Sequence, residues 1–433
     1  MPFKYILIII IPILFSLNVK ANNIETIFEG LDFPTMFSIK ENSKNKIFVA
    51  EHFTGNIKLI DLKTKQEKLL FSVGEKIGYE KSWEAGLNSV VPSPNFSEDN
   101  TFFINYTDKN YDVIISRIII KENKYEENIV LKIERGNDTS AHHCGYMLFD
   151  EDDLLNICVG DFLDTSNPYN LGTLSGKIIR LKVLGEDTYT IPKENPYYGS
   201  NDIKNEILFF GLRNPWKFSI KNHNFYIPDV GNDDWEELNI LENYKSNLIN
   251  NGFGWPYYEG NFKKNDIEQL DKINLNDRID PILSYPHNYE ELIGCSIIGG
   301  EIYDGELYPD WKNTYIFTDI CSDKIWGLKK INNKYKITEL YDLDDQPTFL
   351  GEDNDGEIIL LTMGGEILRL KLPLENKEFV EPYFYFLNIL KLEGDKNINL
   401  IRNEYINSYR YKIGDKIVKF IKFFKFWGNE PRS

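Results

Sequence analysis

The feature that most constrains the fold is a unit of short apolar strands and polar turns that recurs over residues 30–373. Runs rich in Ile, Phe, Tyr and Val are bounded by Asp, Asn and Gly, and no helical periodicity interrupts them, which indicates an all-β chain. Six such units can be placed along the sequence, at residues 36–62, 89–120, 145–183, 207–241, 296–330 and 347–372.

Several of these units share one order of elements: an apolar strand, an Asp/Asn/Gly turn, a second strand, and a third strand that ends in an apolar and basic run. A three- or four-stranded antiparallel sheet cannot cover both of its own faces, whereas like sheets stacked around an axis cover one another. The repeat therefore predicts a six-bladed β-propeller, and the alternative is a pair of β-sandwiches. In a propeller the loops at one end of the central channel form a polar bowl, so we expect the functional residues there.

The N-terminus has the pattern of a secretory signal peptide: Lys4, an apolar run from Tyr5 to Leu17, and a small-residue cleavage pattern that ends at Ala21. The alternative is a membrane anchor, but the run is shorter than the ~20 apolar residues that a span requires, and Pro12 interrupts it. We therefore predict that residues 1–21 are removed and that the protein is exported, either to the periplasm or out of the cell.

Residues 22–373 are assigned to the propeller, and residues 374–433 to a C-terminal extension that we expect to be partly helical. The extension has few turn signals, and in residues 416–427 lysines punctuate a continuous aromatic and aliphatic run. Such a segment can lie on an anionic membrane surface as an amphipathic helix, which would give the protein a peripheral membrane contact. Alternatively, it packs as a helix on the propeller or on a partner.

The chain is acidic, with a formal net charge of −18 at pH 7. It therefore has no general basic surface to neutralise phosphate groups, and we expect no nucleic-acid partner. Its apolar fraction of 42% is sufficient for a large buried core.

Four cysteines in an exported chain can form disulfides. Cys144 and Cys158 flank the acidic turn at residues 150–153, so a hairpin around that turn brings them nearly opposite each other. Cys295 and Cys321 lie at the ends of strands in one predicted unit. Two local disulfides are therefore expected, and the alternative is a set of free buried thiols.

A histidine and an aspartate of one hairpin form the first candidate site. His142 precedes a predicted strand, and Asp161 follows the second strand of the same hairpin, so both can meet at one end of the sheet. A carboxylate that accepts from one imidazole nitrogen fixes the tautomer and makes the other nitrogen a better base. The alternative is a loop histidine that is satisfied by its neighbours.

The second candidate site combines a cation with an acidic turn. Arg213, followed by Asn214, supplies a planar guanidinium suited to a carboxylate or a quinone oxygen. The turn at residues 229–234 can offer carbonyl and carboxylate oxygens to Ca²⁺. Alternatively, the turn is an ordinary hairpin turn and the Arg-Asn-Pro segment caps a strand.

Short motifs follow one another along the chain at residues 51–57, 86–96, 142–145, 160–161, 176–181, 191–199, 211–216, 229–239 and 252–260. In this order and spacing they resemble the glucose/sorbosone dehydrogenases, a family that includes soluble quinoprotein sugar dehydrogenases and the propeller of hedgehog-interacting protein. The resemblance covers nearly all of residues 30–372.

The resemblance implies an oxidoreductase that oxidises a sugar, an aldose or a related alcohol, by hydride transfer to pyrroloquinoline quinone (PQQ) with the help of Ca²⁺. His142 looks like the general base that takes the proton of the anomeric hydroxyl, and Asp161 matches the carboxylate that orients it. Arg213 is implied as electrophilic support for the same reaction.

The resemblance also implies a cofactor site. Arg213 and Asn214 match positions that contact the quinone, and Glu84 matches a further cofactor-binding position. The backbone carbonyls of Gly231 and Asn232 match positions that hold the cofactor's Ca²⁺.

The chain departs from the quinoprotein pattern at several cofactor positions. Glu84 replaces a glutamine, the Cys321–Ser322 region replaces a lysine, and Gln346 and Thr348 replace a pair of arginines. Each missing charged hydrogen bond costs ~1.5–3 kcal/mol, so the affinity for a quinone with three carboxylates would fall by orders of magnitude.

Cys295 and Cys321 resemble instead a cysteine-bearing branch of the family. The alternative function is therefore a non-catalytic propeller that binds a glycan or an envelope protein.

Overall fold

The computed structural model describes residues 23–386, except for residues 40–42, 44, 79–81, 83, 123, 136–140, 186–187, 247–251, 265–274, 276–277, 288–292, 375–376 and 383–384. The expected signal peptide at residues 1–21 and the lysine-containing segment at residues 416–427 lie outside the described residues, so both remain predictions. Within the described part of the chain, no helix is long and apolar enough to cross a membrane.

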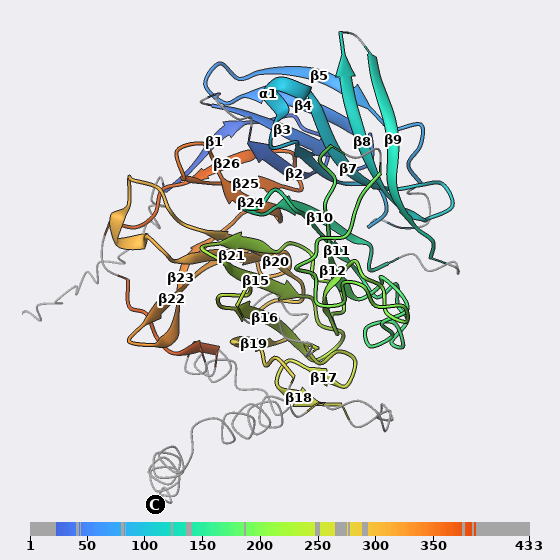
Figure 1. Cartoon of the computed structure of the whole chain (residues 1–433). Coiled ribbons are helices and arrows are strands. Elements are labelled where there is room, and N and C mark those ends of the chain that lie inside the picture. Colours follow the sequence, from blue (N-terminus) through green and yellow to red (C-terminus); the bar gives the residue numbers. More distant parts are fainter. Residues whose placement is uncertain are drawn as a thin grey trace, which may run out of the picture.

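Six four-stranded antiparallel sheets form a six-bladed β-propeller, as the sequence predicts (Figure 1). The first blade contains β2 (Pro34–Ile39), β3 (Lys46–Glu51), β4 (Asn56–Asp61) and β5 (Gln66–Ser72). The second contains β6 (Leu87–Pro92), β7 (Thr101–Thr107), β8 (Val113–Lys121) and β9 (Lys124–Ile133). The third contains β10 (Cys144–Phe149), β11 (Leu155–Val159), β12 (Lys177–Leu181) and β13 (Ile207–Phe210).

The remaining blades follow the same order of strands. The fourth blade contains β14 (Ser219–Lys221), β15 (Asn224–Asp229), β16 (Trp235–Leu241) and β19 (Leu283–Pro286). The fifth contains β20 (Ile297–Ile302), β21 (Tyr315–Asp319), β22 (Lys324–Ile331) and β23 (Lys334–Asp342). The sixth contains β24 (Pro347–Glu352), β25 (Ile358–Thr362), β26 (Ile367–Leu370) and β1 (Ile24–Phe28).

Other regular structure is sparse in the described residues. It consists of a two-stranded ribbon, β17 (Tyr258–Glu259) and β18 (Phe262–Lys263), and of two helical turns, α1 (Phe96–Asp99) and η1 (Pro309–Trp311).

The ring is closed by pairing the two ends of the propeller. Strand β1 pairs antiparallel with β26, so Ile24 lies opposite Leu370 and Phe28 lies opposite Ile367. The first strands of the blades contact one another at β2/β6, β6/β10, β14/β20, β20/β24 and β24/β2, which places them around the central axis.

One of the predicted units has wrong boundaries. The unit at residues 207–241 combines β13, which is the outer strand of the third blade, with three strands of the fourth blade. The fourth blade begins at Ser219 and takes its outer strand from β19. A long segment between β12 and β13 separates β13 from its own blade in sequence, so the order of strands alone assigns it to the wrong sheet.

Both expected disulfides are present, Cys144–Cys158 and Cys295–Cys321. The first joins β10 to β11, in the hairpin around the acidic turn that the sequence indicates. The second joins the segment before β20 to the segment after β21, at one end of the fifth blade.

The chain continues past the sixth blade and returns to the fifth. Val380 pairs with Ile337 of β23, and Phe386 is fully buried with its ring stacked on Tyr285. The first part of the C-terminal extension therefore packs along the outer edge of the fifth blade.

Candidate functional site

A cavity of about 260 Å³ lies where segments from all six blades converge. Its wall includes residues that precede the first strands of the blades and residues from the turns at the same end of the sheets. The lining residues are Phe33, Thr35, His52, Glu84, His142, Arg213, Asn214, Trp216, Val230, Gly231, Asn232, His287, Cys295, Ser296, Ile298, Ile320 and Thr348.

His142 and Asp161 form a buried pair at this cavity. Nδ1 of His142 lies 2.5 Å from Oδ1 of Asp161, and the two residues are 7% and 1% exposed. The other carboxylate oxygen, Oδ2, accepts a hydrogen bond of 2.8 Å from the indole N–H of Trp255. The Asp161 carboxylate is thus held on both sides, and it fixes the orientation of the His142 ring.

The backbone of His142 has a left-handed conformation, with φ of 60°. Glu84 holds this conformation, because its Oε2 accepts the N–H of His142 at 2.7 Å and the N–H of His143 at 3.3 Å. Gly160 is required on the other side, since a Cβ there would lie 2.0 Å from the carbonyl oxygen of His142. Glu84 therefore lines the cavity as predicted, and its carboxylate also caps the backbone of the candidate base.

Arg213 also lines the cavity, and its guanidinium already has partners within the chain. Its Nη1 donates to the carbonyl of Val230 at 3.2 Å, and its Nη2 donates to Oδ1 of Asn232 at 3.0 Å. The guanidinium also lies 5.5 Å from the ring centroid of Trp255. Because the Asp161 N–H donates to the carbonyl of Arg213 at 2.8 Å, the two candidate sites form one connected unit.

Asp229 shapes the loop that carries Arg213 and Asn214. Its two carboxylate oxygens accept the backbone N–H groups of Arg213 at 2.8 Å and of Asn214 at 2.7 Å. Burial raises the pKa of Asp229 to about 7. This aspartate lies in the turn that the sequence suggested for Ca²⁺, but here it binds the neighbouring loop.

Glu259 organises the turn that contains Gly231 and Asn232. Its Oε1 accepts four consecutive backbone N–H groups, those of residues 232–235, at 2.7 to 3.1 Å. Its Oε2 binds Nζ of Lys264 at 2.9 Å. The turn therefore directs its amides to a carboxylate of the chain itself, and the prediction that its carbonyls hold Ca²⁺ remains untested.

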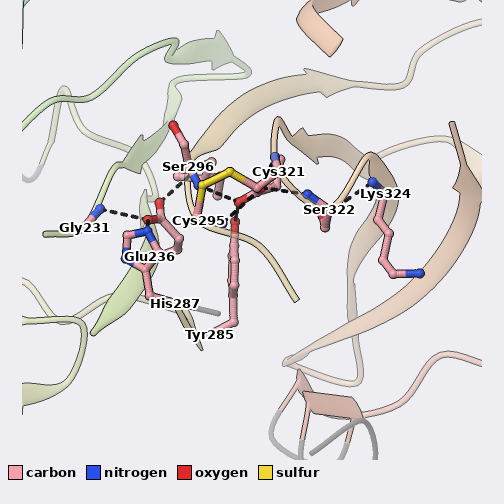
Figure 2. Close-up of a disulfide and its surroundings, with 11 residues drawn as sticks. Gly231, Glu236, Tyr285, His287, Cys295, Ser296, Cys321, Ser322 and Lys324 are labelled. Carbon is pink, nitrogen blue, oxygen red and sulfur yellow. Dashed lines mark hydrogen bonds and ion pairs between the residues drawn. A yellow bond between two sulfur atoms is a disulfide. The ribbon is translucent and has the colours of Figure 1, made fainter. Parts of the chain in front are cut away.

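Glu236 and His287 lie at the side of the cavity beneath the Cys295–Cys321 disulfide (Figure 2). Oε1 of Glu236 accepts the N–H of Gly231 at 3.2 Å and lies 3.3 Å from Nε2 of His287. Burial raises the pKa of Glu236 well above its usual value and lowers the pKa of His287. Burial thus disfavours the charged form of both side chains.

Asp319 holds the disulfide itself. Its Oδ1 accepts the backbone N–H groups of Cys321 at 2.8 Å and of Cys295 at 3.2 Å, and its Oδ2 accepts the Tyr285 hydroxyl at 2.8 Å. The disulfide and this carboxylate together fix the part of the wall formed by Cys295.

The structure brings most of the predicted site residues to this one cavity. Glu84, His142, Arg213, Asn214, Gly231, Asn232 and Cys295 line it directly. Asp161 lies directly behind His142, whereas the Cys144–Cys158 disulfide lies within the sheet of the third blade. Thr348 also lines the cavity, and its hydroxyl donates to the carbonyl of Pro34.

Sequence reasoning missed several residues that organise the site. Trp255 and Glu259 lie in the motif at residues 252–260, which indicated a family but no chemistry. Arg135 was also missed; its guanidinium lies 4.4 Å from the centroid of the Phe162 ring and donates to the carbonyl of Ala141 at 2.8 Å. The partners of Trp255 and Glu259 are distant in sequence, so no short-range pattern marks these two residues.

The cavity does not fit a quinone with three carboxylates. Among the described residues that line it, Arg213 is the only lysine or arginine, and its guanidinium is already bound to Val230 and Asn232. Glu84 adds a carboxyl group to the same wall. Two buried atoms, Nε of Arg213 and Oδ1 of Asn214, have no hydrogen-bond partner among the described residues. A neutral ligand with hydroxyl groups matches this set of donors and acceptors better than a trianion does.

The described residues also contain no cluster of three or more His, Cys, Asp or Glu side chains that could hold a metal ion.

Comparison with known proteins gives a consistent result. A family model described as Glucose / Sorbosone dehydrogenase matches residues 31–369. The HIPL1 protein of Arabidopsis thaliana is 28% identical over 272 residues, which cover 52% of this chain but only 38% of that protein. Aldose sugar dehydrogenase YliI of Escherichia coli (strain K12) is 23% identical over 304 residues, which cover 66% of this chain and 77% of that protein.

The fold is also shared with solved structures. The PQQ-bound form of the aldose sugar dehydrogenase from Streptomyces coelicolor superposes with a TM-score of 0.63 and 19% sequence identity. The match covers 81% of this chain and 97% of that one.

Proposed function

The chain belongs to the glucose/sorbosone dehydrogenase family, and from this premise we propose that it is an oxidoreductase acting on a neutral sugar or a related alcohol. His142 removes the proton of the sugar hydroxyl that is oxidised. Asp161 orients His142, and Arg213 faces the oxygen on which negative charge develops.

The observation that carries the proposal is the 2.5 Å contact between His142 Nδ1 and Asp161 Oδ1 at the wall of the cavity. When the Nδ1–H group donates a hydrogen bond to the carboxylate, Nε2 carries no proton and is the base that accepts the hydroxyl proton. The charge of Asp161 then stabilises the imidazolium that forms. A site that only bound a sugar would not require this arrangement.

Oxidation of the alcohol also requires an acceptor for the hydride that leaves carbon. Since Arg213 is the only lysine or arginine that the structure describes in the lining, we propose a two-electron acceptor with at most one carboxylate. PQQ, which the resemblance implies, carries three carboxylates and is therefore expected to bind weakly. In the family pattern, the Ca²⁺ expected at Gly231 and Asn232 is the ion that binds together with PQQ.

The test is a dye-linked assay with a panel of aldoses and sugar alcohols. We expect turnover with a neutral quinone as acceptor, loss of that turnover in His142→Ala, and no saturable binding of PQQ with Ca²⁺ in calorimetry. If no sugar binds and none is oxidised with any acceptor, the proposed function is wrong. Tight PQQ binding would reject the proposal about the acceptor alone.

A second candidate function is recognition of a glycan without oxidation, and the presence of a single lysine or arginine among the described lining residues favours it. The two functions differ in one result. If the His142→Ala variant keeps its affinity for the sugar and the wild-type protein shows no turnover with any acceptor, the propeller is a binding module. If the partner is an envelope protein and not a glycan, the His142→Ala variant should still capture that protein in a pull-down.

We also propose that the protein is exported, to the periplasm or out of the cell. Two disulfides are the support for this, because disulfides persist mainly in oxidising compartments.

A further inference from the structure

A second hollow lies in the third blade, at the end of the sheet away from His142. Strands β10 and β11 pair so that Cys144 lies opposite Val159 near the first cavity and Phe149 lies opposite Leu155 at the other end. The hollow, of about 700 Å³, lies beside that second end, and we call it the blade-three pocket. Its lining residues are Asp152, Leu154, Arg180, Lys182, Thr190, Ile191, Pro192, Lys193, Glu194, Tyr198 and Lys245.

The blade-three pocket is positively charged in a protein that is strongly acidic. Among the described residues of its lining, four are lysine or arginine and two are acidic, a surplus of two positive charges, whereas the whole chain carries −18. Lys245 is paired with Asp152 at 2.6 Å. A local excess of cations within an overall negative field indicates a site that attracts an anion.

Arg180 differs from the lysines of the pocket because it is buried. It is 2% exposed, and its Nε donates to Oδ1 of Asn195 at 2.9 Å. Nδ2 of Asn195 donates back to the carbonyl of Arg180 at 3.0 Å, so the guanidinium is held in a fixed orientation.

The guanidinium of Arg180 has no ion-pair partner in the part of the chain that the structure describes. Its Nη2 is buried and has no hydrogen-bond partner, and no carboxylate of the described residues forms an ion pair with it. A buried cation is strongly destabilising unless an anion compensates it, and arginine presents a planar pair of donors that fits oxyanions such as phosphate.

We propose that the blade-three pocket binds a phosphate monoester, with Arg180 and Lys182 on the phosphate oxygens and the organic part of the ligand in the remaining volume. A phosphate monoester carries about −1.5 to −2 charges at pH 7, which matches the surplus of two positive charges in the lining. The volume of about 700 Å³ is far larger than a free phosphate ion needs and is in the range of sites for small organic molecules. The pocket therefore has room for an organic group beside the phosphate, and glucose 6-phosphate serves as the probe.

The experiment is calorimetric titration of the full chain with glucose 6-phosphate, inorganic phosphate and glucose. We expect saturable binding of glucose 6-phosphate that weakens as the salt concentration rises, and no binding of glucose at this site. Tighter binding of glucose 6-phosphate than of inorganic phosphate identifies a sugar phosphate as the ligand. Equal binding of both supports phosphate recognition with the free ion as the source.

Variants separate this pocket from the rest of the surface. Lys182→Glu combined with Lys193→Glu changes two exposed lining residues and is expected to weaken binding of glucose 6-phosphate by about 100-fold. Lys63→Glu combined with Lys68→Glu makes the same change in net charge on the first blade and is expected to leave the affinity within twofold.

Arg180→Lys keeps the charge but loses the fork of donors, and is expected to weaken binding about tenfold. If the Arg180→Lys variant does not fold, the comparison of the two double-lysine variants still tests the proposal. The proposal is overturned if neither phosphate compound binds, or if the variant with Lys182→Glu and Lys193→Glu binds as tightly as the wild-type protein.

Discussion

Single side chains decide how the candidate base is held. His142 has a left-handed backbone, a conformation that is costly for most residues with a side chain and that persists where its surroundings impose it. Here the surroundings are the Glu84 carboxylate on the amide side and Gly160 against the carbonyl. Glu84, which the sequence pattern places at the cofactor, therefore has a structural task that its charge alone does not suggest.

Replacing Asp161 by asparagine tests the role of the histidine–aspartate pair. Asp161→Asn removes the charge that stabilises the His142 imidazolium, so we expect turnover to fall by about 10²- to 10⁴-fold. Sugar affinity should change by less than about threefold, since the cavity lining itself is unchanged. Steady-state kinetics and calorimetry measure the two quantities.

The matched control for that variant is Asp164→Asn, because Asp164 is exposed in the same loop and binds only Ser166 and nearby backbone. It should retain full turnover. Equal losses in Asp161→Asn and Asp164→Asn would show that the loop, and not the proton transfer, was affected.

Glu259 is the residue that positions Asn232 and, through it, Arg213. Although burial raises the pKa of this carboxyl group, the hydrogen bond from the Asp234 amide and the ion pair with Lys264 hold it below its usual value. The side chain is therefore a buried anion whose charge is compensated by four amides and one ammonium group.

Glu259→Gln should lower the free energy of unfolding by about 1–3 kcal/mol, because the amides and Lys264 lose a charged acceptor. Sugar binding should weaken as well, since the Arg213 guanidinium loses its fixed partner. Urea unfolding and calorimetry check both expectations. The control Glu306→Gln changes a glutamate that is 88% exposed, and it should alter neither quantity.

Strands of different blades are joined by two lysines, the buried Lys217 and the partly buried Lys221. Nζ of Lys217, next to β14, donates to the carbonyls of Gly300 in β20 and of Leu350 in β24. Lys221 of β14 pairs with Glu352 of β24 at 3.1 Å. The fourth, fifth and sixth blades are thus linked by polar contacts in addition to apolar packing.

Glu352 makes this junction sensitive to pH. Burial, followed by the nearby charge of Glu301, raises the pKa of Glu352 from 4.5 to about 7. A carboxyl group whose pKa is higher in the folded protein holds its proton there, so its contribution to stability is complete below about pH 4.5 and is lost as the pH rises through 7.

We therefore expect the wild-type free energy of unfolding to fall by about 1–2 kcal/mol through this group as the pH rises from 5 to 8. Solvent screening limits the effect, because the side chain of Glu352 is 29% exposed. Glu352→Gln cannot ionise and should lose that part of the pH dependence, as measured by urea unfolding at both pH values. An unchanged pH profile in this variant would contradict the expectation.

Closure of the ring is a property of the whole molecule. Strand β1 comes from the start of the chain and completes the sixth blade, where Ile27 and Phe28 are 6% and 7% exposed. Without β1, the edge of β26 would be unpaired, and the apolar burial that Ile27 and Phe28 contribute would be lost.

A chain that starts at Gly30 should therefore be less stable than one that starts at Asn22, by about 3–6 kcal/mol from the two lost apolar side chains alone. Scanning calorimetry measures the loss. Hydrogen exchange should show lost protection at the amides of Ile367–Leu370, whereas those of Lys177–Leu181 in the third blade should stay protected. Equal stability of the two chains would show that β1 does not close the ring.

The sequence by itself determined the architecture and a large part of the site. The short apolar strands and their turns specify sheets that cannot bury both faces alone, so the propeller follows from local patterns and the hydrophobic effect. The hairpin around residues 150–153 likewise places Cys144 near Cys158 and His142 near Asp161, because strand pairing is a short-range consequence of the turn.

Only the tertiary structure decided which strands share a blade and what surrounds the candidate base. Strand β13 joins β12 across a long intervening segment, and Glu84, Trp255 and Glu259 act on residues 24 to 94 positions away in sequence. Such contacts arise when the ring closes and brings loops of different blades together, and no local pattern encodes them. The same holds for the uncompensated charge of Arg180, because burial and the absence of an ion pair are properties of the folded chain.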